Sequence, residues 1–462
     1  MKVPIKSDRD PGNKISRRRF LGGTAAAAAA FTIVPRHVLG GIGFTSPSDK
    51  LNIGCVGVWG KGRSDIISVS TENIVALCDV DDEQMGKFEE SVSEEESGRE
   101  LFAKAKKYRD FRKMLEIENL DALTISIPDH SHAAVAMMAI KMGKHAFVQK
   151  PLTHTIYEAR KLAEAAREAK VVTQMGNQGH AGEGGRLINE WIWDGAIGAV
   201  REVHAWTNRP IWPQGIKRPS MVVSRPPTLD WEVWLGPAPY RPYHYAYAPF
   251  NWRGWRDFGT GAIGDMGAHI LDHPFWALKL GHPTSVEATC SEFNDETYPL
   301  TSKIQYHFPA RDEMPPVELT WFDGENVPPR PPELEEGRRM GDRGGGVVFI
   351  GDKGMLMCST YGMNPRIIPE TKMREYERPA KTIPRSPGIH EEWVAACKGG
   401  PATTSSFDYA GTLTEVMLLG IIAMRMAHLN TPLEWDGENM KITNIPEANE
   451  YIHKLYRYGW RL

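Results

Sequence analysis

A glycine-rich stretch at residues 259–273 carries an acid, a base and a second acid at regular spacing. Asp265, His269 and Asp272 stand at positions i, i+4 and i+7, so an α-helix would place all three on one face. An imidazole between two carboxylates suits general acid–base chemistry. An ordinary helix start, with Asp265 near the N-cap and His269 on a surface or in a core, explains the same spacing. The rest of the chain has to decide between the two.

A lysine that can share this chemistry follows a short apolar run. Residues 145–148 have the composition of a buried parallel strand, and Gln149, Lys150 and Pro151 come directly after it. Ligands of open α/β sheets bind at the carboxyl ends of the strands. This position makes Lys150 a candidate for the site, with a surface lysine in a turn as the alternative.

A glycine turn near the start of the chain predicts a nucleotide-binding element. A buried strand leads into Gly57, Gly60 and Gly62, and a helix is expected over residues 63–70. Asp79 ends the next apolar run, 22 positions after Gly57. A carboxylate there binds ribose hydroxyls and repels a 2′-phosphate, so the pattern favours NAD over NADP.

Trp59 departs from the regular spacing of this turn. The pattern G-x-G-x-x-G requires a glycine at position 59, where the backbone approaches the pyrophosphate, but the glycine is displaced to Gly60. The indole either reroutes the turn or crowds the phosphates. Trp59 therefore joins the cofactor-binding candidates.

The order of predicted elements divides the chain into domains. Strands and helices alternate over residues 50–175, as in a Rossmann dinucleotide-binding domain of the α/β class. The composition then shifts to strand-like runs, prolines and aromatic residues, which predicts a second domain over residues 176–435. Residues 436–462 form a C-terminal tail whose aromatic residues could dock against a neighbouring subunit.

The first 44 residues are predicted to be an export signal and linker. Arg17 and Arg18 are followed by Phe20 and Leu21, and then by a weakly apolar, alanine-rich run. This arrangement is typical of a Tat signal, which exports proteins that have already folded around a cofactor. The run is too short to span a bilayer, so we expect a periplasmic or otherwise exported protein without a membrane anchor.

Composition limits the kind of partner. The chain has 462 residues and a formal net charge of −3, which argues against nucleic acid and favours a small polar molecule. Its five cysteines are scattered without metal-ligand spacing, so neither a disulfide framework nor a zinc site is expected.

Tryptophan is concentrated in one part of the second domain. Nine of the 14 tryptophans lie between residues 191 and 276, among prolines and tyrosines. Flat aromatic faces suit the CH faces of sugars, and their polar tips reach hydroxyls. The alternative is that they pack a loop-rich domain. Trp252 is the residue from this group that we expect to contact substrate.

Motifs along residues 50–435 resemble the Gfo/Idh/MocA family of NAD(P)-dependent oxidoreductases, and in particular its exported bacterial members. They are the glycine turn, Asp79, PDHSH at 128–132, GKHAFVQKPL at 143–152, GNQ at 176–178 and GAIGDMGAHILDH at 261–273. The resemblance implies a Rossmann domain joined to an α+β domain with an open-faced, mainly antiparallel sheet, and a homo-oligomer. The family hallmark E-K-P is here Gln149-Lys150-Pro151, which removes the bias of a glutamate toward protonated lysine.

The resemblance also implies roles for individual residues. His269 is the base, Asp265 its partner, and Lys150 the group that hydrogen-bonds the reacting oxygen. The expected substrate-binding residues are Asn177, Asp272 and Trp252. The expected contacts of a tightly bound NAD are Gly57, Trp59, Gly60, Gly62, Asp79, Pro128, His132, Gln149 and Lys150.

We therefore expect hydride transfer between bound NAD and a hydroxyl of a sugar, glycoside or polyol. One alternative is an NAD-dependent glycosidase that acts by transient oxidation and elimination. Another is a non-catalytic, cofactor-bound sugar sensor or scaffold, suggested by Trp59 and Gln149. A metal site at Asp265, His269 and Asp272 has no fourth ligand spaced with it, so no metal is expected.

Overall fold

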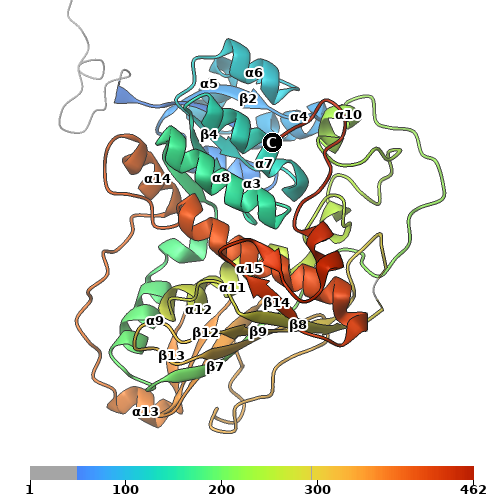
Figure 1. Cartoon of the computed structure of the whole chain (residues 1–462). Coiled ribbons are helices and arrows are strands. Elements are labelled where there is room, and N and C mark those ends of the chain that lie inside the picture. Colours follow the sequence, from blue (N-terminus) through green and yellow to red (C-terminus); the bar gives the residue numbers. More distant parts are fainter. Residues whose placement is uncertain (1–48, 293) are drawn as a thin grey trace, which may run out of the picture. The chain divides into compact units, whose positions relative to one another are not determined.

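The computed structural model describes residues 49–292 and 294–462, and residues 51–462 form one compact unit. The predicted export segment, residues 1–44, lies outside the described residues. Figure 1 shows the order of the elements along the chain.

The first part of this unit is a Rossmann domain. Six parallel strands lie in the order β3-β2-β1-β4-β5-β6, and the order reverses direction between β1 and β4. Strands β4 and β5 are short, apolar and mostly buried, as expected where helices cover both faces of a parallel sheet. The strands are β1 (Asn52–Val56), β2 (Asn73–Cys78), β3 (Lys106–Tyr108), β4 (Ala122–Ile125), β5 (His145–Val148) and β6 (Thr173–Met175). The helices are α3 (Lys61–Ser68), α4 (Asp82–Val92), α5 (Glu96–Lys104), α6 (Phe111–Ile117), α7 (Asp129–Lys141) and α8 (Ile156–Ala169).

The second part contains a nine-stranded sheet in the order β13-β12-β11-β7-β10-β9-β8-β14-β15. All neighbouring pairs are antiparallel except β7 and β10. Residues of β9 alternate between buried and half-buried, as expected when helices cover one face. The strands are β7 (Val200–Thr207), β8 (Ser285–Cys290), β9 (Ser302–Phe308), β10 (Val317–Asp323), β11 (Gly345–Gly351), β12 (Met355–Ser359), β13 (Arg366–Ile368), β14 (Leu433–Asp436) and β15 (Lys441–Ile442).

The remaining helices connect or cover these two sheets. The α-helices are α9 (Glu183–Trp193), α10 (Trp231–Leu235), α11 (Gly261–Ile270), α12 (Asp272–Ala277), α13 (Glu370–Glu375), α14 (Ile389–Cys397) and α15 (Phe407–Met426). Short 3₁₀ turns are η2 (Gln178–Ala181), η3 (Asn251–Gly254), η4 (Ala427–Leu429) and η5 (Pro446–Tyr451). The fold class expected from the sequence, a Rossmann domain followed by an α+β domain with a mainly antiparallel sheet, is confirmed.

Helix α15 lies between the two sheets (Figure 1). It contacts α8 of the Rossmann domain on one side and strands β8 and β9 on the other. Together with η4 it is long and apolar enough to cross a membrane, yet most of it is buried inside the protein, which is the character of a core helix. It therefore couples the two domains through apolar contact.

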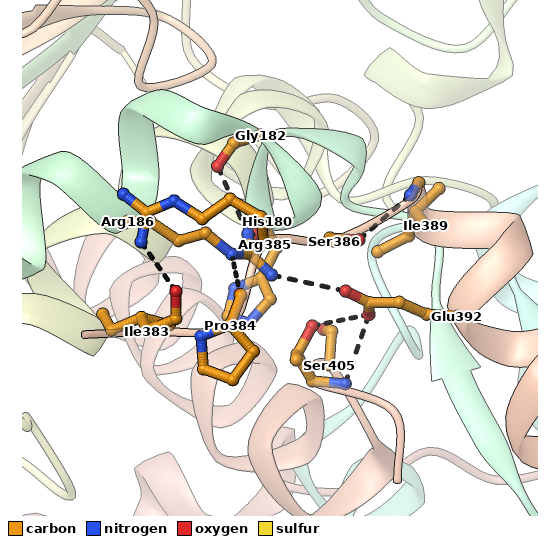
Figure 2. A network of polar contacts seen from close by, with 12 residues as sticks. His180, Gly182, Arg186, Ile383, Pro384, Arg385, Ser386, Ile389, Glu392 and Ser405 are labelled. Atoms are coloured by element: carbon orange, nitrogen blue, oxygen red, sulfur yellow. Dashed lines mark hydrogen bonds and ion pairs between the residues drawn. The ribbon is translucent and has the colours of Figure 1, made fainter. Parts of the chain in front are cut away.

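Helix α14 ties the late part of the chain to the Rossmann core. Ile389 and Trp393 belong to the same apolar cluster as Ile53 and Phe147. A polar network extends this contact, and Figure 2 shows its central residues. Glu392 of α14 pairs with Arg186 of α9, whose Nε donates to the Pro384 carbonyl at 2.7 Å. Helix α9 is thereby fixed against the Rossmann side of the molecule.

Candidate active site

A cavity of about 800 Å³ runs along the carboxyl ends of the Rossmann strands and is also lined by the second domain. Asp79 follows β2 and Lys150 follows β5, and both line it. Strands β1 and β4 separate β2 from β5, so these two residues stand three strand spacings, about 14 Å, apart. The cavity thus has a β2 end, at Asp79, and a β5 end, at Lys150.

The glycine turn forms the wall of the cavity between the two ends. Gly57 has φ +84° and donates its N–H to the Cys78 carbonyl at 2.8 Å. A Cβ at Gly57 would lie 2.2 Å from the Ser126 carbonyl oxygen, and one at Gly62 would lie 2.1 Å from the Gly57 carbonyl oxygen. Side chains cannot occupy these positions, which leaves backbone accessible before helix α3. This is the cradle that a dinucleotide pyrophosphate requires, at a helix N-terminus.

Trp59 does not prevent the turn from closing. The displaced Gly60 has a positive φ of +61°, which a side chain would disfavour, and precedes α3. The indole of Trp59 is 37% exposed and lines the cavity. The structure therefore shows a rerouted turn, in which the glycine with positive φ stands at position 60 and not at position 59.

Asp79 is clamped at the end of β2. Its carboxylate accepts hydrogen bonds from the backbone N–H of Val58 at 3.0 Å and of Asp81 at 3.1 Å. Burial raises the pKa of Asp79 to about 6 despite these bonds. The acceptor is therefore held in place by backbone alone, where a ribose would lie if a dinucleotide occupied the turn. These residues fit NAD.

Lys150 and Asp265 meet at the β5 end. Lys150 Nζ donates to Asp265 Oδ1 at 2.7 Å and to the Asp265 backbone carbonyl at 2.8 Å. Burial lowers the pKa of Lys150, and the Asp265 carboxylate opposes that shift. Lys150 and two arginines hold the pKa of Asp265 well below its usual range against the effect of burial. Helix α11 thus delivers a carboxylate to a lysine 115 positions earlier in the chain.

His269 lies one turn after Asp265 on α11 and also lines the cavity. The ring is buried, contacts Tyr361 edge-on with 4.9 Å between ring centroids, and its Nδ1 has no hydrogen-bond partner among the described residues. Burial, and then the nearby Lys150 charge, lower the pKa of His269 well below its usual value. The imidazole is therefore neutral at neutral pH and able to accept a proton.

The Asp265 carboxylate binds cations instead of His269. Arg209 Nε approaches its Oδ2 at 3.1 Å, and Arg253 Nε approaches its Oδ1 at 3.3 Å. Arg253 also reaches both carboxylate oxygens of Asp129 at 3.0 Å. The expected partnership of Asp265 with His269 is thus replaced by ion pairs, because three cations from distant parts of the chain converge on this carboxylate.

Comparison with known proteins identifies the family. Residues 51–177 match the Gfo/Idh/MocA domain described as "Oxidoreductase family, NAD-binding Rossmann fold", and residues 199–314 match that family's C-terminal alpha/beta domain. The chain belongs to the Gfo/Idh/MocA oxidoreductase family.

Individual relatives are distant. Levoglucosan dehydrogenase from Pseudarthrobacter phenanthrenivorans is 24% identical over 42% of this chain and 41% of its own length. Glycosyl hydrolase family 109 protein 1 from Shewanella sp. (strain ANA-3) is 24% identical over 41% of this chain and 45% of its own length. The chain thus spans less than half of the length of these curated relatives.

A solved structure extends the likeness over nearly the whole fold. The WlbA dehydrogenase from Bordetella pertussis, solved in complex with NADH and UDP-GlcNAcA, has a TM-score of 0.57 and 16% identity. The match covers 84% of this chain and 99% of that one. At this identity the likeness establishes a shared fold.

Gln149 stands where the Gfo/Idh/MocA hallmark has glutamate, and a buried aspartate supports it. Its Nε2 donates to Asp65 Oδ2 at 2.9 Å. Asp65 also accepts hydrogen bonds from Ser126 at 2.7 Å and His390 at 3.0 Å. The carboxylate that the hallmark glutamate would bring to position 149 is therefore supplied by Asp65 of helix α3. Gln149 contacts Asp65 and also lines the cavity.

Asp272 lies away from the cavity, contrary to the expectation of a substrate contact. Helix α11 ends at Ile270, and Asp272 begins α12. Its buried carboxylate accepts hydrogen bonds from His180 at 2.9 Å and from the Tyr409 hydroxyl at 2.7 Å. Leu271 between the two helices keeps helical φ and ψ, so Asp272 lies about two turns beyond Asp265, past the cavity wall, where His180 and Tyr409 bind it.

Three further residues, predicted as contacts of NAD or of substrate, have different surroundings. The buried ring of His132 lies between the carbonyl oxygens of Ile127 at 2.7 Å and Pro151 at 2.8 Å, so it braces the loops that carry Pro128 and Lys150. Pro128 itself lines the cavity. Asn177 is fully buried, and neither end of its amide has a hydrogen-bond partner among the described residues. It follows β6 and adjoins Gln178, which lines the cavity, so its role as a substrate contact stays a prediction.

Tryptophans of the segment between residues 191 and 276 contribute both to an apolar core and to the cavity wall. Trp231, Trp234 and Trp255 belong to one apolar cluster, in which the first two stack with centroids 4.5 Å apart. Trp252 and Trp212 line the cavity, and the Arg253 guanidinium lies over their rings at 4.3 and 5.9 Å. Trp234 also lines the cavity, so this segment both packs a core and contributes to the cavity wall, and contact of Trp252 with substrate stays a prediction.

Sequence reasoning missed Arg209 and Arg253. A signal for Arg209 was available, because it stands before Pro210 just after strand β7, as Lys150 stands before Pro151 just after β5. Both cations thus follow the carboxyl end of a strand. Arg253 sits in the short η3 turn and gave no comparable signal.

Proposed function

We propose that this protein is an NAD-dependent oxidoreductase that transfers a hydride between bound nicotinamide and a hydroxyl of a sugar, glycoside or polyol. The observation that carries the proposal is that one cavity is lined by the glycine turn, Asp79, Lys150 and His269. The nicotinamide supplies the hydride acceptor or donor when it is bound. The protein's own groups bind the dinucleotide, orient the alcohol and move its proton.

The proton-handling role falls to the β5 end. In oxidation, neutral His269 accepts the hydroxyl proton of the substrate as the C–H bond breaks. Lys150 donates a hydrogen bond to the same oxygen and stabilises the negative charge that develops on it. Asp265 holds the lysine by two contacts. In reduction, the imidazolium returns the proton to the oxygen.

A carbohydrate-like substrate is supported by two observations. Trp212 and Trp252 line the cavity, and the half-buried Trp252 is the one that we expect to present its ring to sugar CH groups. Levoglucosan dehydrogenase is among the relatives. Asp79 supports NAD over NADP. The segment around Leu229, which forms a bridge with Asp81, borders the β2 end, and we expect it to cover part of a bound cofactor there.

The cofactor and the reaction are tested together. Purified protein is denatured, and the released nucleotides are identified by mass spectrometry. A panel of sugars and polyols is then added to the NAD-loaded protein while reduced cofactor is followed by absorbance. Bound NAD(H) and its reduction by members of the panel are expected. A protein that neither carries nor binds NAD or NADP would refute the proposal.

A second function is favoured by the similarity to glycosyl hydrolase family 109 protein 1. In an NAD-dependent glycosidase, oxidation of a sugar hydroxyl would acidify the neighbouring C–H bond. Loss of that proton would expel the aglycone by elimination, water would add to the resulting unsaturated ketone, and the ketone would be reduced again. Such a cycle releases the aglycone with no net change in cofactor. Release of nitrophenol from nitrophenyl glycosides, with constant total NADH, would identify it.

We further propose export through the Tat pathway and assembly into a homo-oligomer. Arg17 and Arg18, with the apolar run after them, support the first. The exposed aromatic Tyr458 near the end of the tail suits a subunit contact. Replacing both arginines by lysine should trap the protein in the cytoplasm, and light scattering measures the oligomeric state.

A further inference from the structure

The β5 end of the cavity holds more positive than negative charge. Lys150, Arg209 and Arg253 meet there, and the carboxylates that pair with them are Asp129 and Asp265. The other acidic residues that line the cavity, Asp79, Asp81 and Glu83, follow β2 or lie in α4, at the opposite end.

The other titratable groups near the cluster do not cancel this excess. His269 is neutral, since burial and Lys150 lower its pKa. The lining cation Lys61 is paired with Asp65 at 3.0 Å. Asp342, which helps to raise the pKa of Tyr361, does not line the cavity and accepts hydrogen bonds from the N–H of Gly344 at 2.7 Å and from Thr360. Each of the three cations contacts a carboxylate, but they share only two, so the cluster carries one positive charge in excess among the described residues.

Both arginines keep unused hydrogen-bond donors. Arg209 Nε donates to Asp265, and its Nη1 donates to the Asn208 side chain at 2.6 Å. Arg253 Nε pairs with Asp265, and its Nη1 donates to Asp129. Within the described parts of the chain, no residue accepts a hydrogen bond from either Nη2. Both side chains line the cavity and are only 21% and 15% exposed.

Neither Nη2 is a buried atom, so both donors can be reached from the cavity. A ligand that brings an anionic acceptor to them gains charge-assisted hydrogen bonds. The excess of a single charge matches a carboxylate better than a phosphate, which carries up to two negative charges. The planar carboxylate also suits guanidinium donors.

We propose that the substrate is an acidic sugar, such as a uronic or aldonic acid, whose carboxylate binds Arg209 and Arg253 beside Lys150. This proposal rests on the proposed function and specifies its substrate class. The carboxylate would occupy the unused Nη2 donors, while the reacting hydroxyl lies at Lys150 and His269. In this arrangement the two arginines bind the charged group of the sugar, and the neighbouring Lys150 and His269 bind its reacting hydroxyl.

The test measures binding, so that it does not depend on turnover. Protein saturated with NADH is titrated calorimetrically with D-glucuronate, D-galacturonate and D-gluconate. The same titrations use the neutral amides of these acids, the parent sugars and glucose 6-phosphate. At least one acid should bind about 10- to 100-fold more tightly than its own amide, which has the same shape without the charge.

Variants at Arg209 locate the charge. Arg209→Gln keeps an N–H donor for Asp265 but removes the charge, and the preference for acid over amide should fall to near unity. Arg209→Lys should retain part of it. The control is Arg374→Gln, because this α13 arginine is 79% exposed and the change should leave the preference intact. NADH affinity is measured for each variant to show that the cofactor site persists.

The outcomes separate the two proposals. Equal binding of acids and amides, no binding of any acid, tighter binding of the sugar phosphate, or a preference unchanged in Arg209→Gln would each overturn the acidic-sugar assignment. Oxidation of neutral sugars alone would do the same while leaving the oxidoreductase proposal intact. A clear acid preference without hydride transfer would support the binding assignment and count against the proposed reaction.

Discussion

The two ends of the cavity are built in opposite ways. At the β2 end, the site consists of the backbone of the glycine turn and of Asp79, which backbone N–H groups hold in place. All of these groups come from a stretch of about 25 residues. At the β5 end, the site consists of charged side chains, which come from positions as far apart as Asp129 and Asp265.

This difference has a physical consequence. A cradle of backbone binds what all dinucleotides share, and it tolerates no added side-chain atoms. A cluster of side chains recognises whatever charge and shape its members present, and it depends on several ion pairs at once. Damage at the first end should therefore appear in cofactor affinity, and damage at the second in turnover or substrate choice.

The largest effect is expected from His269→Gln. Loss of the base should lower kcat by about 10²- to 10⁴-fold, whereas NAD affinity should change little because the glycine turn is untouched. Steady-state kinetics and cofactor titration measure the two quantities. The matched control is His307→Gln on β9, where the side chain is 41% exposed. A loss of NAD affinity equal to the loss of kcat would break the division between the two ends.

Gly57→Ala should have the reverse signature. The new Cβ would lie 2.2 Å from the Ser126 carbonyl oxygen, at a φ that L residues rarely adopt. Strain of about 1–3 kcal/mol should weaken NAD binding by roughly 10- to 100-fold. The control, Gly86→Ala on α4, adds a Cβ that meets no atom within 4 Å and should bind NAD normally. Normal NAD affinity in Gly57→Ala would contradict this account of the turn.

Gln149→Glu tests the support behind the cavity. The change places a second carboxylate about where the amide now donates to Asp65, at 2.9 Å. We expect a loss of roughly 2 kcal/mol in the free energy of unfolding at pH 7. Because repulsion raises the folded-state pKa of the new glutamate above its unfolded value, the loss should shrink as the pH falls through that raised pKa.

Urea denaturation at neutral and acidic pH measures this effect. Gln84→Glu on α4 is the matched control, since it makes the same change away from Asp65. A Gln149→Glu protein as stable as the parent at both pH values would show that Asp65 does not take over the place of the hallmark glutamate.

The smallest effect concerns the pH dependence of NAD binding. Burial raises the pKa of Asp79 to about 6, and ribose hydroxyls bind its ionised form. Affinity should hold above pH 6 and fall by about tenfold between pH 7.5 and 5, as the carboxylate takes up a proton. Asp79→Asn should bind more weakly at neutral pH and lose most of this dependence. An unchanged pH profile in that variant would assign it to another group.

The contrast between the two ends also explains what was predictable from the sequence. The turn and Asp79 are close along the chain, and strand, glycine and helix patterns are local, so their arrangement followed from spacing. Lys150 could be predicted to line the site because it follows a strand of a parallel sheet, where position along the chain fixes position at the sheet edge. His269 and Asp265 were predicted from their helical spacing and from the family resemblance, and all three line the cavity.

Asp272 marks the limit of that reasoning. Its i+7 spacing predicted a place beside His269 in the cavity, but the carboxylate joins His180 and Tyr409 in the interior. Spacing along a helix predicts a shared face, but not how far along the helix a cavity extends. The extent of the cavity is decided by packing of elements that are distant in sequence.

The sequence by itself determined the fold class and the β2 end, because these depend on local pattern and on backbone freedom at glycine. Only the tertiary structure decided the partners of Asp265. Arg209, Arg253 and Lys150 are separated by up to 103 positions, and no periodicity links them. Their convergence arises because strands β5 and β7 and the η3 turn end near the same helix. The charge that results could be counted only after the chain had folded.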